Sequence, residues 1–389
     1  MPNFYVIDPS LFNMTGHEYV MNLFIYKEAI SHGYEPVILC QKEFIPNPSD
    51  NIKIHPVFQY TPYDKHPISW DYDQTVLTNG NREIFSLLST HLPSESLPKN
   101  SVILLHTACI TLLVGLARWI KKLHRPDLKI RIVLRWPAFR RMFHRENAEA
   151  YCKKACSIYP KLQGDIRFYA DNRGLKAYYE KLTGLPFLQT PIGIQFHDIP
   201  PIPPPSKQEG LRFVFAGNPR EEKGFFLIVN ALTKHLERYP KDIFHLHTIH
   251  SPKISMDLRA RFPNNVCTNN NFLSGRAYFE YLLKGDILLV PYNIESYQYR
   301  TSHIFMEALG LGRSAILTKG SWMEEVLQDF SQPLGIVMEE WTADSLIEAM
   351  HQIHEQRESL LQNAYDTAEY IRNTHNPSQW VNLMLEESS

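Results

Sequence analysis

Short runs of β-branched and aromatic residues alternate with longer segments of helical periodicity along most of the chain. The first series of runs lies at residues 4–8, 36–40, 52–58, 102–107, 129–135, 167–170 and 187–192. The second lies at residues 211–216, 244–250, 266–272, 287–292, 315–319 and 335–339. Strands that alternate with helices are typical of parallel sheets covered by helices on both faces. The pattern therefore predicts an α/β chain with two doubly wound, Rossmann-type sheets.

A proline-rich stretch separates the two series of runs. Residues 200–205 read PPIPPP, and proline is excluded from the interiors of helices and sheets. A length of 389 residues also favours two domains, at roughly 100 to 200 residues each. The expected organisation is a Rossmann-like domain at 1–195, a linker at 196–209, a second Rossmann-like domain at 210–372 and a C-terminal helix at 373–389 that could cross back to the first domain.

Composition excludes a disordered or fibrous chain, because 44% of the residues are hydrophobic and 21% are charged. The net charge of −1 gives no reason to expect a general nucleic-acid binder. The positive and negative charges are unevenly distributed along the chain, however. Residues 1–192 hold 23 basic and 17 acidic residues, or +6, which leaves 17 of the 40 basic and 24 of the 41 acidic residues, or −7, for the remainder.

The most basic segment is 118–154, with twelve Lys and Arg against three acids and with aromatic residues interleaved. Such a surface around Arg140 and Arg141 would suit an anionic membrane face or a phosphate-bearing acceptor. A solvated cationic helix face is the alternative interpretation.

The cysteines and the amino terminus bear on the compartment. Five cysteines are sparse and odd in number, which favours a reducing environment over a disulfide framework. Cys152 and Cys156 could lie one helical turn apart, but no second pair follows at zinc-site spacing, so buried thiols are the better interpretation. MPNFYVIDPSL lacks the basic region of a signal sequence, and the apolar stretch 102–117 is too short to span a bilayer. We expect a cytoplasmic protein that could also act at the inner face of the membrane.

Two turns carry candidate chemistry, because ligands of open α/β sheets bind beyond the carboxyl ends of the strands. The first, GNPREEKG at 217–224, leaves a strand and enters a helix, so Arg220 and Lys223 would lie where helix N–H groups already favour an anion. A diphosphate would suit this turn. An ordinary capped turn with two solvated cations is the alternative.

The second turn precedes the helix that begins near residue 303. Thr301 and Ser302 are natural amino-terminal caps. Glu307 lies one to two turns into the helix. It would either accept hydrogen bonds from ribose hydroxyls or be a solvated helix residue, and its apolar neighbours indicate burial, which requires a partner.

These segments resemble a known family. GNPREEKG, followed by SHIFMEALGLGRSAILTKGSWMEEV, is similar to the C-terminal domain of family 4 retaining glycosyltransferases with the GT-B fold. NMTGHEYVMNLFIYKEAISHGYEPVIL and RFYADNRGLKAYYEKLTGLPFLQTPIGI resemble parts of the N-terminal domain of that family. The resemblance covers nearly the whole chain. It implies two Rossmann-type domains that face a cleft, with the acceptor on the first domain and the nucleotide-sugar donor on the second.

The resemblance assigns roles to residues of the second domain. Lys223 and Arg220 would bind the donor diphosphate with Thr301 and Ser302, and Glu307 would bind the ribose. Asn218 stands where the family has an arginine, and Tyr299 stands where the family has a glutamate that contacts the donor sugar. Asn218, Tyr299 and Arg300 are thereby candidate donor contacts.

In the first domain the resemblance indicates three further residues. Gly16 matches a glycine that lets the backbone approach the diphosphate. The family's catalytic-side histidine has no direct match, since VLRWP offers Arg135 instead, and His106 is the nearest alternative. We therefore take His106, Arg135 and Glu307 as the catalytic candidates.

A competing motif would imply a metal. Asp71-Tyr72-Asp73 has the DxD pattern of metal-dependent glycosyltransferases with a single-domain fold, but it falls in the polar segment HPISWDYDQ, which reads as a loop. We expect no metal and no cofactor apart from the nucleotide-sugar co-substrate.

The sequence thus predicts a metal-independent retaining glycosyltransferase that uses a nucleotide diphosphate sugar and a saccharide or lipid-linked hydroxyl acceptor. Two alternatives remain open: a non-hydrolysing sugar-nucleotide epimerase, and a catalytically idle nucleotide- or carbohydrate-binding protein.

Overall fold

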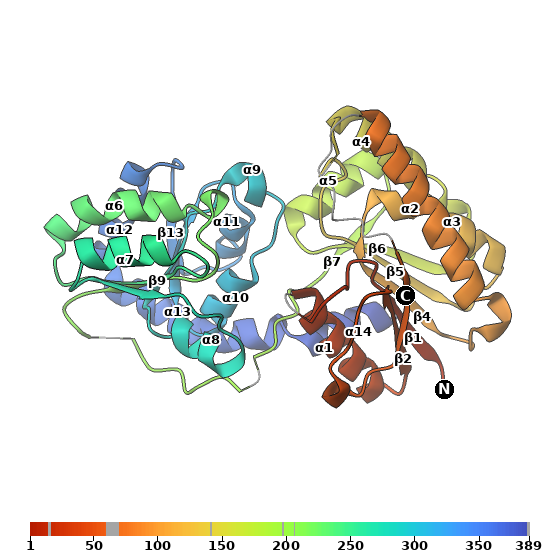
Figure 1. The fold of residues 1–389 in the computed structure, drawn as a ribbon, viewed down its shortest axis with the longest axis horizontal. Coiled ribbons are helices and arrows are strands. Elements are labelled where there is room, and N and C mark those ends of the chain that lie inside the picture. The colour runs from red at the N-terminus through yellow and green to blue at the C-terminus, as the bar shows by residue number, and fades with distance from the viewer. Residues whose placement is uncertain (15–16, 60–69, 141, 197, 206, 387–389) are drawn as a thin grey trace. The chain divides into compact units, whose positions relative to one another are not determined.

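The computed structural model describes residues 1–14, 17–59, 70–140, 142–196, 198–205 and 207–386. The chain divides into two compact units (Figure 1). Unit 1 comprises Met1–Gly193 and Pro377–Ser389, and unit 2 comprises Ile194–Asn376.

Unit 1 contains a parallel sheet whose strand order, within the described residues, is β3-β2-β1-β4-β5-β6-β7. Its strands are β1 (Asn3–Ile7), β2 (Glu35–Gln41), β3 (Ile54–Phe58), β4 (Val102–Ala108), β5 (Lys129–Leu134), β6 (Asp165–Ala170) and β7 (Phe187–Gln189). Its helices are α1 (His17–Ser31), α2 (Trp70–His91), α3 (Ile110–Leu123), α4 (Arg145–Cys156), α5 (Arg173–Thr183) and α14 (Pro377–Leu385).

Unit 2 repeats this arrangement with the order β10-β9-β8-β11-β12-β13 in the part of the chain that the structure describes. Its strands are β8 (Arg212–Phe215), β9 (Ile243–His247), β10 (Val266–Asn269), β11 (Ile287–Val290), β12 (Ser314–Thr318) and β13 (Gly335–Met338). Its helices are α6 (Phe225–Arg238), α7 (Pro252–Arg261), α8 (Gly275–Leu282), α9 (Ile294–Tyr297), α10 (His303–Gly310), α11 (Trp322–Leu327), α12 (Ala343–Glu355) and α13 (Arg357–Thr374).

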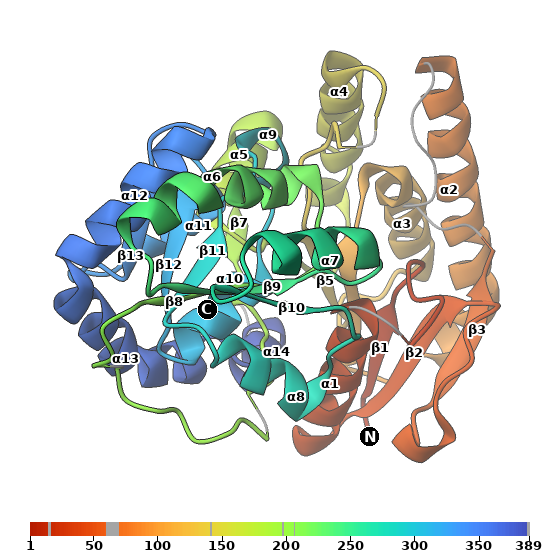
Figure 2. The ribbon, with the colours of Figure 1, turned by 60° about the vertical axis from the view of Figure 1, so that its left-hand side comes forward.

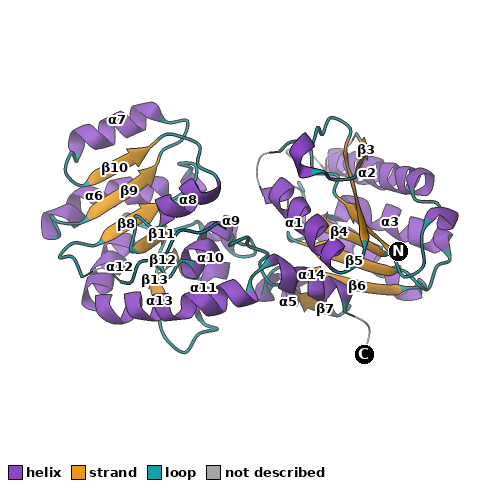
Figure 3. Cartoon of the chain, turned by 90° about the horizontal axis from the view of Figure 1, so that it is seen from below, coloured by secondary structure: helices purple, strands orange, loops and turns teal. Residues whose placement is uncertain are grey.

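Both sheets are enclosed by helices, as Figure 3 shows for each unit. Strands covered on both faces must be apolar on both faces, which is why β4 is buried along its whole length. In unit 2 the core joins residues of the central strands to apolar residues of α6 and α12. The predicted α/β class, the two Rossmann-type sheets and the approximate positions of the strands are therefore confirmed.

The carboxyl-terminal helix α14 belongs to unit 1. Its Trp380 packs against Phe24 of α1, with ring centroids 6.2 Å apart. The buried Arg131 of β5 donates from Nε to the carbonyl oxygen of Met384 over 2.7 Å. The chain thus enters unit 2 at Ile194 and returns to unit 1 at Pro377.

The proline-rich segment after residue 195 is part of unit 2. Phe196 stacks on Phe279 of α8 with ring centroids 6.4 Å apart. A β-carbon on Gly310 of α10 would lie 2.3 Å from the Phe196 ring, so this glycine is what admits the aromatic side chain. Aromatic burial fixes the start of this segment on the surface of α8 and α10.

The prediction that Asp71 and Asp73 lie in a loop is wrong, because both fall in the first turn of α2, which runs alongside α3 (Figure 2). Acidic residues are favourable at this end of a helix. Asp73 is 2% exposed and accepts the backbone N–H of Phe143 over 2.5 Å. Burial raises the pKa of Asp73, and hydrogen bonds from the N–H groups of Phe143 and His144 offset part of that rise. The second acid of the motif therefore fixes the loop that precedes α4.

Cys152 and Cys156 of α4 are buried free thiols, as expected. Every helix in the described part of the chain is too short or too polar to cross a membrane.

Candidate functional site

The turn after β8 is shaped by two glycines with positive φ. Gly217 has φ 110° and Gly224 has φ 67°. A β-carbon on Gly224 would lie 2.1 Å from the carbonyl oxygen of Pro291, which follows β11. Only glycine permits this approach. The turns that leave the two central strands of unit 2 are therefore in contact.

Lys223 is the cation that this turn holds in place. It ends the single 3₁₀ turn Glu221–Lys223 before α6 and is only 8% exposed. Its Nζ lies 5.6 Å from the centroid of the Tyr292 ring, and a β-carbon on Gly217 would lie 2.6 Å from the same Nζ. Burial, together with the nearby charges of Arg220 and Arg300, lowers the pKa of Lys223 to about 8. A bound dianion would stabilise the charged ammonium group and so oppose both the burial and the repulsion by the neighbouring cations.

Arg220 and Asn218 lie on the exposed side of the turn. Arg220 pairs with Glu222 over 3.0 Å, and Asn218 is exposed. Both side chains are free to reorient toward a ligand, whereas the ammonium group of Lys223 is not.

The turn after β11 leads into α10. Ser302 is the amino-terminal cap of α10, since its hydroxyl accepts the N–H of Phe305 over 3.3 Å, while Thr301 precedes the cap. Arg300 lies 4.9 Å from the centroid of the Tyr297 ring, and Tyr299 is partly exposed beside it. The first turn of α10 is also adjacent to the turn after β8, because a β-carbon on Gly217 would lie 3.4 Å from Cδ1 of Ile304.

Glu307 lies one turn further along α10 and has a specific partner. The hydroxyl of Tyr278, on α8, donates to its Oε2 over 2.6 Å. Burial raises the pKa of Glu307 to about 7, although the hydrogen bond from Tyr278 acts in the opposite direction. Glu307 is partly buried, and Tyr278 is the partner that its carboxylate has in the structure.

His247 also contacts the turn after β8, and the sequence analysis did not identify it as a site residue. It ends β9, accepts the N–H of Gly217 at Nδ1 over 3.3 Å and contacts the carbonyl oxygen of Asn271 at Nε2 over 2.8 Å. A ring that accepts at Nδ1 and donates at Nε2 is neutral. Burial and the charge of Lys223 lower the pKa of His247 and so favour this form, against the opposing effect of the bond to Asn271. The available signal was a polar residue at the end of the strand beside β8.

The catalytic candidate His106 is fully buried at the end region of β4 in unit 1. Its Nε2 lies 3.2 Å from Oδ2 of Asp8 and 3.3 Å from Oδ1 of Asn22. Burial alone would raise the pKa of Asp8, but His106, Ser10 and Asn22 together hold it well below its usual range. His106 therefore has the contacts of a structural residue, and its catalytic role stays a prediction.

The other unit 1 candidates that the structure describes, Arg135 and Arg140, follow β5. Nε of Arg135 is 3.3 Å from Oδ2 of Asp171. The guanidinium of Arg140 lies 4.3 Å from the centroid of the Trp136 ring, and Arg145 lies at the same distance from Phe139. Gly16 and Arg141 lie outside the described residues.

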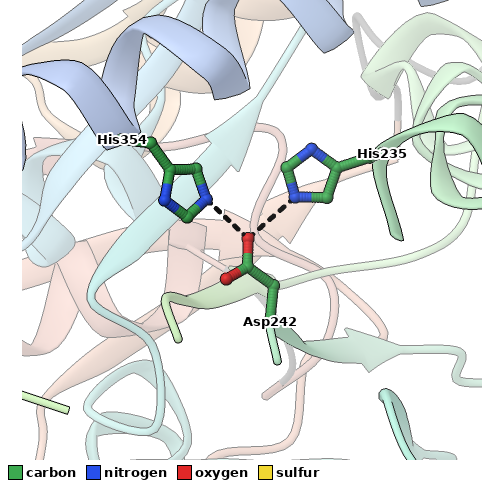
Figure 4. Close-up of side chains that lie close together, drawn as sticks. All are labelled: His235, Asp242 and His354. Carbon is green, nitrogen blue, oxygen red and sulfur yellow. Dashed lines mark hydrogen bonds and ion pairs between the residues drawn. The ribbon is translucent and has the colours of Figure 1, made fainter. Parts of the chain in front are cut away.

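A separate cluster in unit 2 has the composition of a metal site (Figure 4). Nε2 of His235 and Nε2 of His354 lie 2.8 and 2.7 Å from the same oxygen, Oδ2 of Asp242, while Oδ1 accepts the N–H of Leu211 over 2.8 Å. With an ion on Nε2, the Nδ1 of His235 would carry a proton, and that buried atom has no partner among the described residues. Both short contacts are satisfied instead when each Nε2–H donates to the carboxylate. Asp242 precedes β9, whereas the turns above follow the strands, so we assign this cluster a structural role.

The comparisons with known proteins give structural neighbours alone. No protein-family model matches the chain, and no curated protein matches it in sequence. Sucrose-phosphate synthase from Thermosynechococcus elongatus is 11% identical with a TM-score of 0.69, and the match covers 99% of this chain and 97% of that one. HepE from Anabaena in complex with UDP is 10% identical with a TM-score of 0.66 and 98% of both chains covered.

A third neighbour is WaaG, described as a glycosyltransferase involved in lipopolysaccharide biosynthesis. It is 13% identical with a TM-score of 0.62, and the match covers 98% of this chain and 99% of that one. These matches extend over both units, and the strand order of each unit is that of a Rossmann sheet. The chain therefore has the GT-B fold, an α/β architecture of two Rossmann-like units, and in this fold resembles nucleotide-sugar glycosyltransferases.

Proposed function

We propose that the protein is a glycosyltransferase that moves a sugar from a nucleoside diphosphate sugar to the hydroxyl group of a saccharide or lipid-linked acceptor. The observation that carries this proposal is the convergence of Lys223, Gly217 and the capped end of α10 beside Glu307, at the carboxyl ends of the central strands of unit 2. A buried cation beside a helix amino terminus suits a diphosphate, and a carboxylate suits ribose hydroxyls.

The same residues account for the chemistry of transfer. As the bond between the sugar C1 and the diphosphate oxygen breaks, negative charge develops on the leaving diphosphate. Lys223 would stabilise this charge from a position set before the reaction, and Arg220 and Arg300 would add to it from the two flanking turns. The acceptor oxygen forms the new bond to C1, and its proton passes to the departing phosphate. Retention of configuration follows if both events occur on the same face of the sugar, and neither step requires a metal ion.

Donor turnover tests the proposal. The protein is incubated with UDP-glucose, GDP-mannose and ADP-glucose, with and without EDTA, and the released nucleoside diphosphate is measured. UDP-glucose comes first because HepE is described in complexes with UDP and with UDP-glucose. We expect slow hydrolysis of one donor, unchanged by EDTA and lost in Lys223→Ala. An isomerised donor would instead indicate an epimerase, and binding without turnover would indicate an idle protein.

Metal dependence has its own control in the DxD segment. The Asp71→Asn, Asp73→Asn variant should keep its activity as far as it stays folded, because neither residue is assigned to the donor. Loss of activity in the folded variant, with loss in EDTA and rescue by manganese in the wild type, would contradict the metal-independent mechanism.

A further inference from the structure

Two tyrosines on one face of α8 bond to elements next to the donor turns. Tyr278 and Tyr281 are three residues apart, the spacing that places side chains on the same helix face. The Tyr281 hydroxyl donates to the carbonyl oxygen of Phe215 over 3.2 Å, just before the turn after β8. The Tyr278 hydroxyl donates to Oε2 of Glu307 over 2.6 Å. The helix is thus bonded to the end of β8 and to α10, which flank the two turns of the proposed donor site.

We propose that Tyr278 is a positioning residue that favours the ionised form of Glu307 and orients its carboxylate for the ribose of the donor. The inference rests on the proposed function, because it concerns the same nucleotide site. Tyr278 would not touch the sugar or the diphosphate but would act through the carboxylate.

Geometry gives the hydrogen bond its effect. A carboxylate can accept several hydrogen bonds, and a tyrosine hydroxyl donates one. With the Tyr278 hydroxyl on Oε2, the Oε1 atom and the remaining lone pair of Oε2 stay available to two vicinal ribose hydroxyls. A protonated Glu307 would offer fewer acceptors and would have to turn its own O–H toward a partner.

The surroundings of Glu307 explain why the hydrogen bond from Tyr278 affects its charge. Burial disfavours the charged form of Glu307, and among the described residues Tyr278 is the group that opposes this effect. In the neighbouring turns the charge of Arg300 acts on Lys223. Tyr278 is itself partly buried, and its phenol pKa is raised by desolvation and by Glu307, so it remains a donor.

The test compares Tyr278→Phe with Tyr281→Phe. Both variants remove a hydroxyl from the same face of α8, and only the first removes the bond to Glu307. The carboxyl titration of Glu307 is followed by NMR of protein labelled with 13C at Glu Cδ, with the signal assigned through its loss in Glu307→Gln. We expect the midpoint to move to higher pH in Tyr278→Phe and to stay at the wild-type value in Tyr281→Phe. An unchanged midpoint in a folded Tyr278→Phe protein would overturn the proposal whether or not nucleotides bind.

Calorimetry then links the bond to the ligand. The affinity of UDP, GDP and ADP is divided by that of the matching 2′-deoxynucleotide from pH 6 to 8.5, which cancels effects on the diphosphate. In Tyr278→Phe this ratio should be about tenfold lower near pH 7. The increase of the ratio with pH, which follows the ionisation of Glu307, should occur at higher pH than in the wild type. A ratio equal to that of the wild type would contradict the positioning role. If the wild type binds none of the three diphosphates, the proposed function fails, and the ribose role of Tyr278 fails with it.

Discussion

Lys223 and Glu307 illustrate how partial burial prepares two ordinary charged residues for one ligand. The pKa of Lys223 is lowered to about 8, chiefly by burial, and burial raises that of Glu307 to about 7. Each group is therefore close to losing its charge near neutral pH. A diphosphate would favour the charged lysine, and ribose hydroxyls would favour the charged glutamate, so ligand binding and proton binding are coupled at both residues.

This coupling predicts a bell-shaped pH dependence of nucleoside diphosphate affinity. Below about pH 7 Glu307 gains a proton and accepts ribose hydroxyls less well. Above about pH 8 Lys223 loses its proton and its attraction for the diphosphate. Calorimetric titration from pH 5.5 to 9.5 should show the highest affinity between these limits, while a free nucleoside should show the acidic limb alone. A flat profile for the diphosphate would contradict the assignment of both groups.

A second prediction concerns the charge of Glu307 itself. Glu307→Gln keeps the shape of the side chain but removes a charge-assisted acceptor, typically a contribution of about 1.5 to 3 kcal/mol. Affinity for a ribonucleotide should fall by this amount, and affinity for the 2′-deoxy form should fall less. The control is Glu280→Gln on α8, an exposed carboxylate paired with Arg276. If ribonucleotide and deoxynucleotide respond alike to Glu307→Gln, the residue is structural.

At the scale of elements, the strands were predictable and the contacts between distant elements were not. Strands such as β4 read as continuous apolar runs because both faces of a parallel sheet are buried. The start of α2 was misread because its first turn is polar and follows a proline-containing segment, as a loop would. The bond from Tyr278 to Glu307 joins helices 29 residues apart along the chain, and that from Gly217 to His247 spans 30, so neither is local enough to leave a sequence pattern.

The cluster around Asp242 yields a prediction about the stability of unit 2. Burial raises the pKa of Asp242, but the two histidines and the Leu211 N–H outweigh it, so the folded-state pKa is lowered. The carboxylate therefore stabilises the fold above its unfolded pKa of about 3.9, and this contribution is lost as pH falls through the lower, folded value. Asp242→Asn should reduce the free energy of unfolding by about 1.5 to 3 kcal/mol at pH 7, the contribution typical of hydrogen bonds to a charged group.

The matched control is Asp344→Asn on α12, whose carboxylate forms an exposed pair with Lys234 over 2.9 Å. Surface ion pairs contribute little to stability, so the free energy of unfolding of Asp344→Asn, measured in urea, should be close to that of the wild type. The difference in the free energy of unfolding between the wild type and Asp242→Asn should become smaller as the pH approaches 3. A gap that persists unchanged at pH 3 would mean that the charge of Asp242 is not the stabilising feature.

At the scale of the whole molecule, the charges are unevenly divided along the sequence. Residues 1–192 carry +6 and the remainder −7, although the total is −1. In unit 1 the basic segment includes Arg140 stacked on Trp136, and its Phe143 is 57% exposed in the loop that Asp73 fixes. A cation beside exposed aromatic surface suits an anionic interface.

This distribution predicts salt-sensitive association with anionic vesicles. Basic residues near such a surface contribute about 1 kcal/mol each, and the attraction is screened over about 8 Å at physiological ionic strength. Sedimentation with phosphatidylglycerol vesicles should recover the wild type at low salt and much less of an Arg140→Ala, Arg141→Ala variant. Lys234→Ala, Lys241→Ala, with the same change of charge in unit 2, is the control. Absence of wild-type binding would exclude the membrane role.

The most direct measurement for the donor site is the binding of UDP, GDP and ADP, and of their nucleosides, to the wild type and to Lys223→Ala. We predict that the wild type binds at least one diphosphate. Lys223→Ala should weaken that binding about ten- to a hundredfold, as expected for a charge-assisted contact, while nucleoside binding changes little. The exposed Lys234→Ala variant should resemble the wild type. Failure of the wild type to bind all three diphosphates, or an equal loss for diphosphate and nucleoside in Lys223→Ala, would contradict a donor site in unit 2.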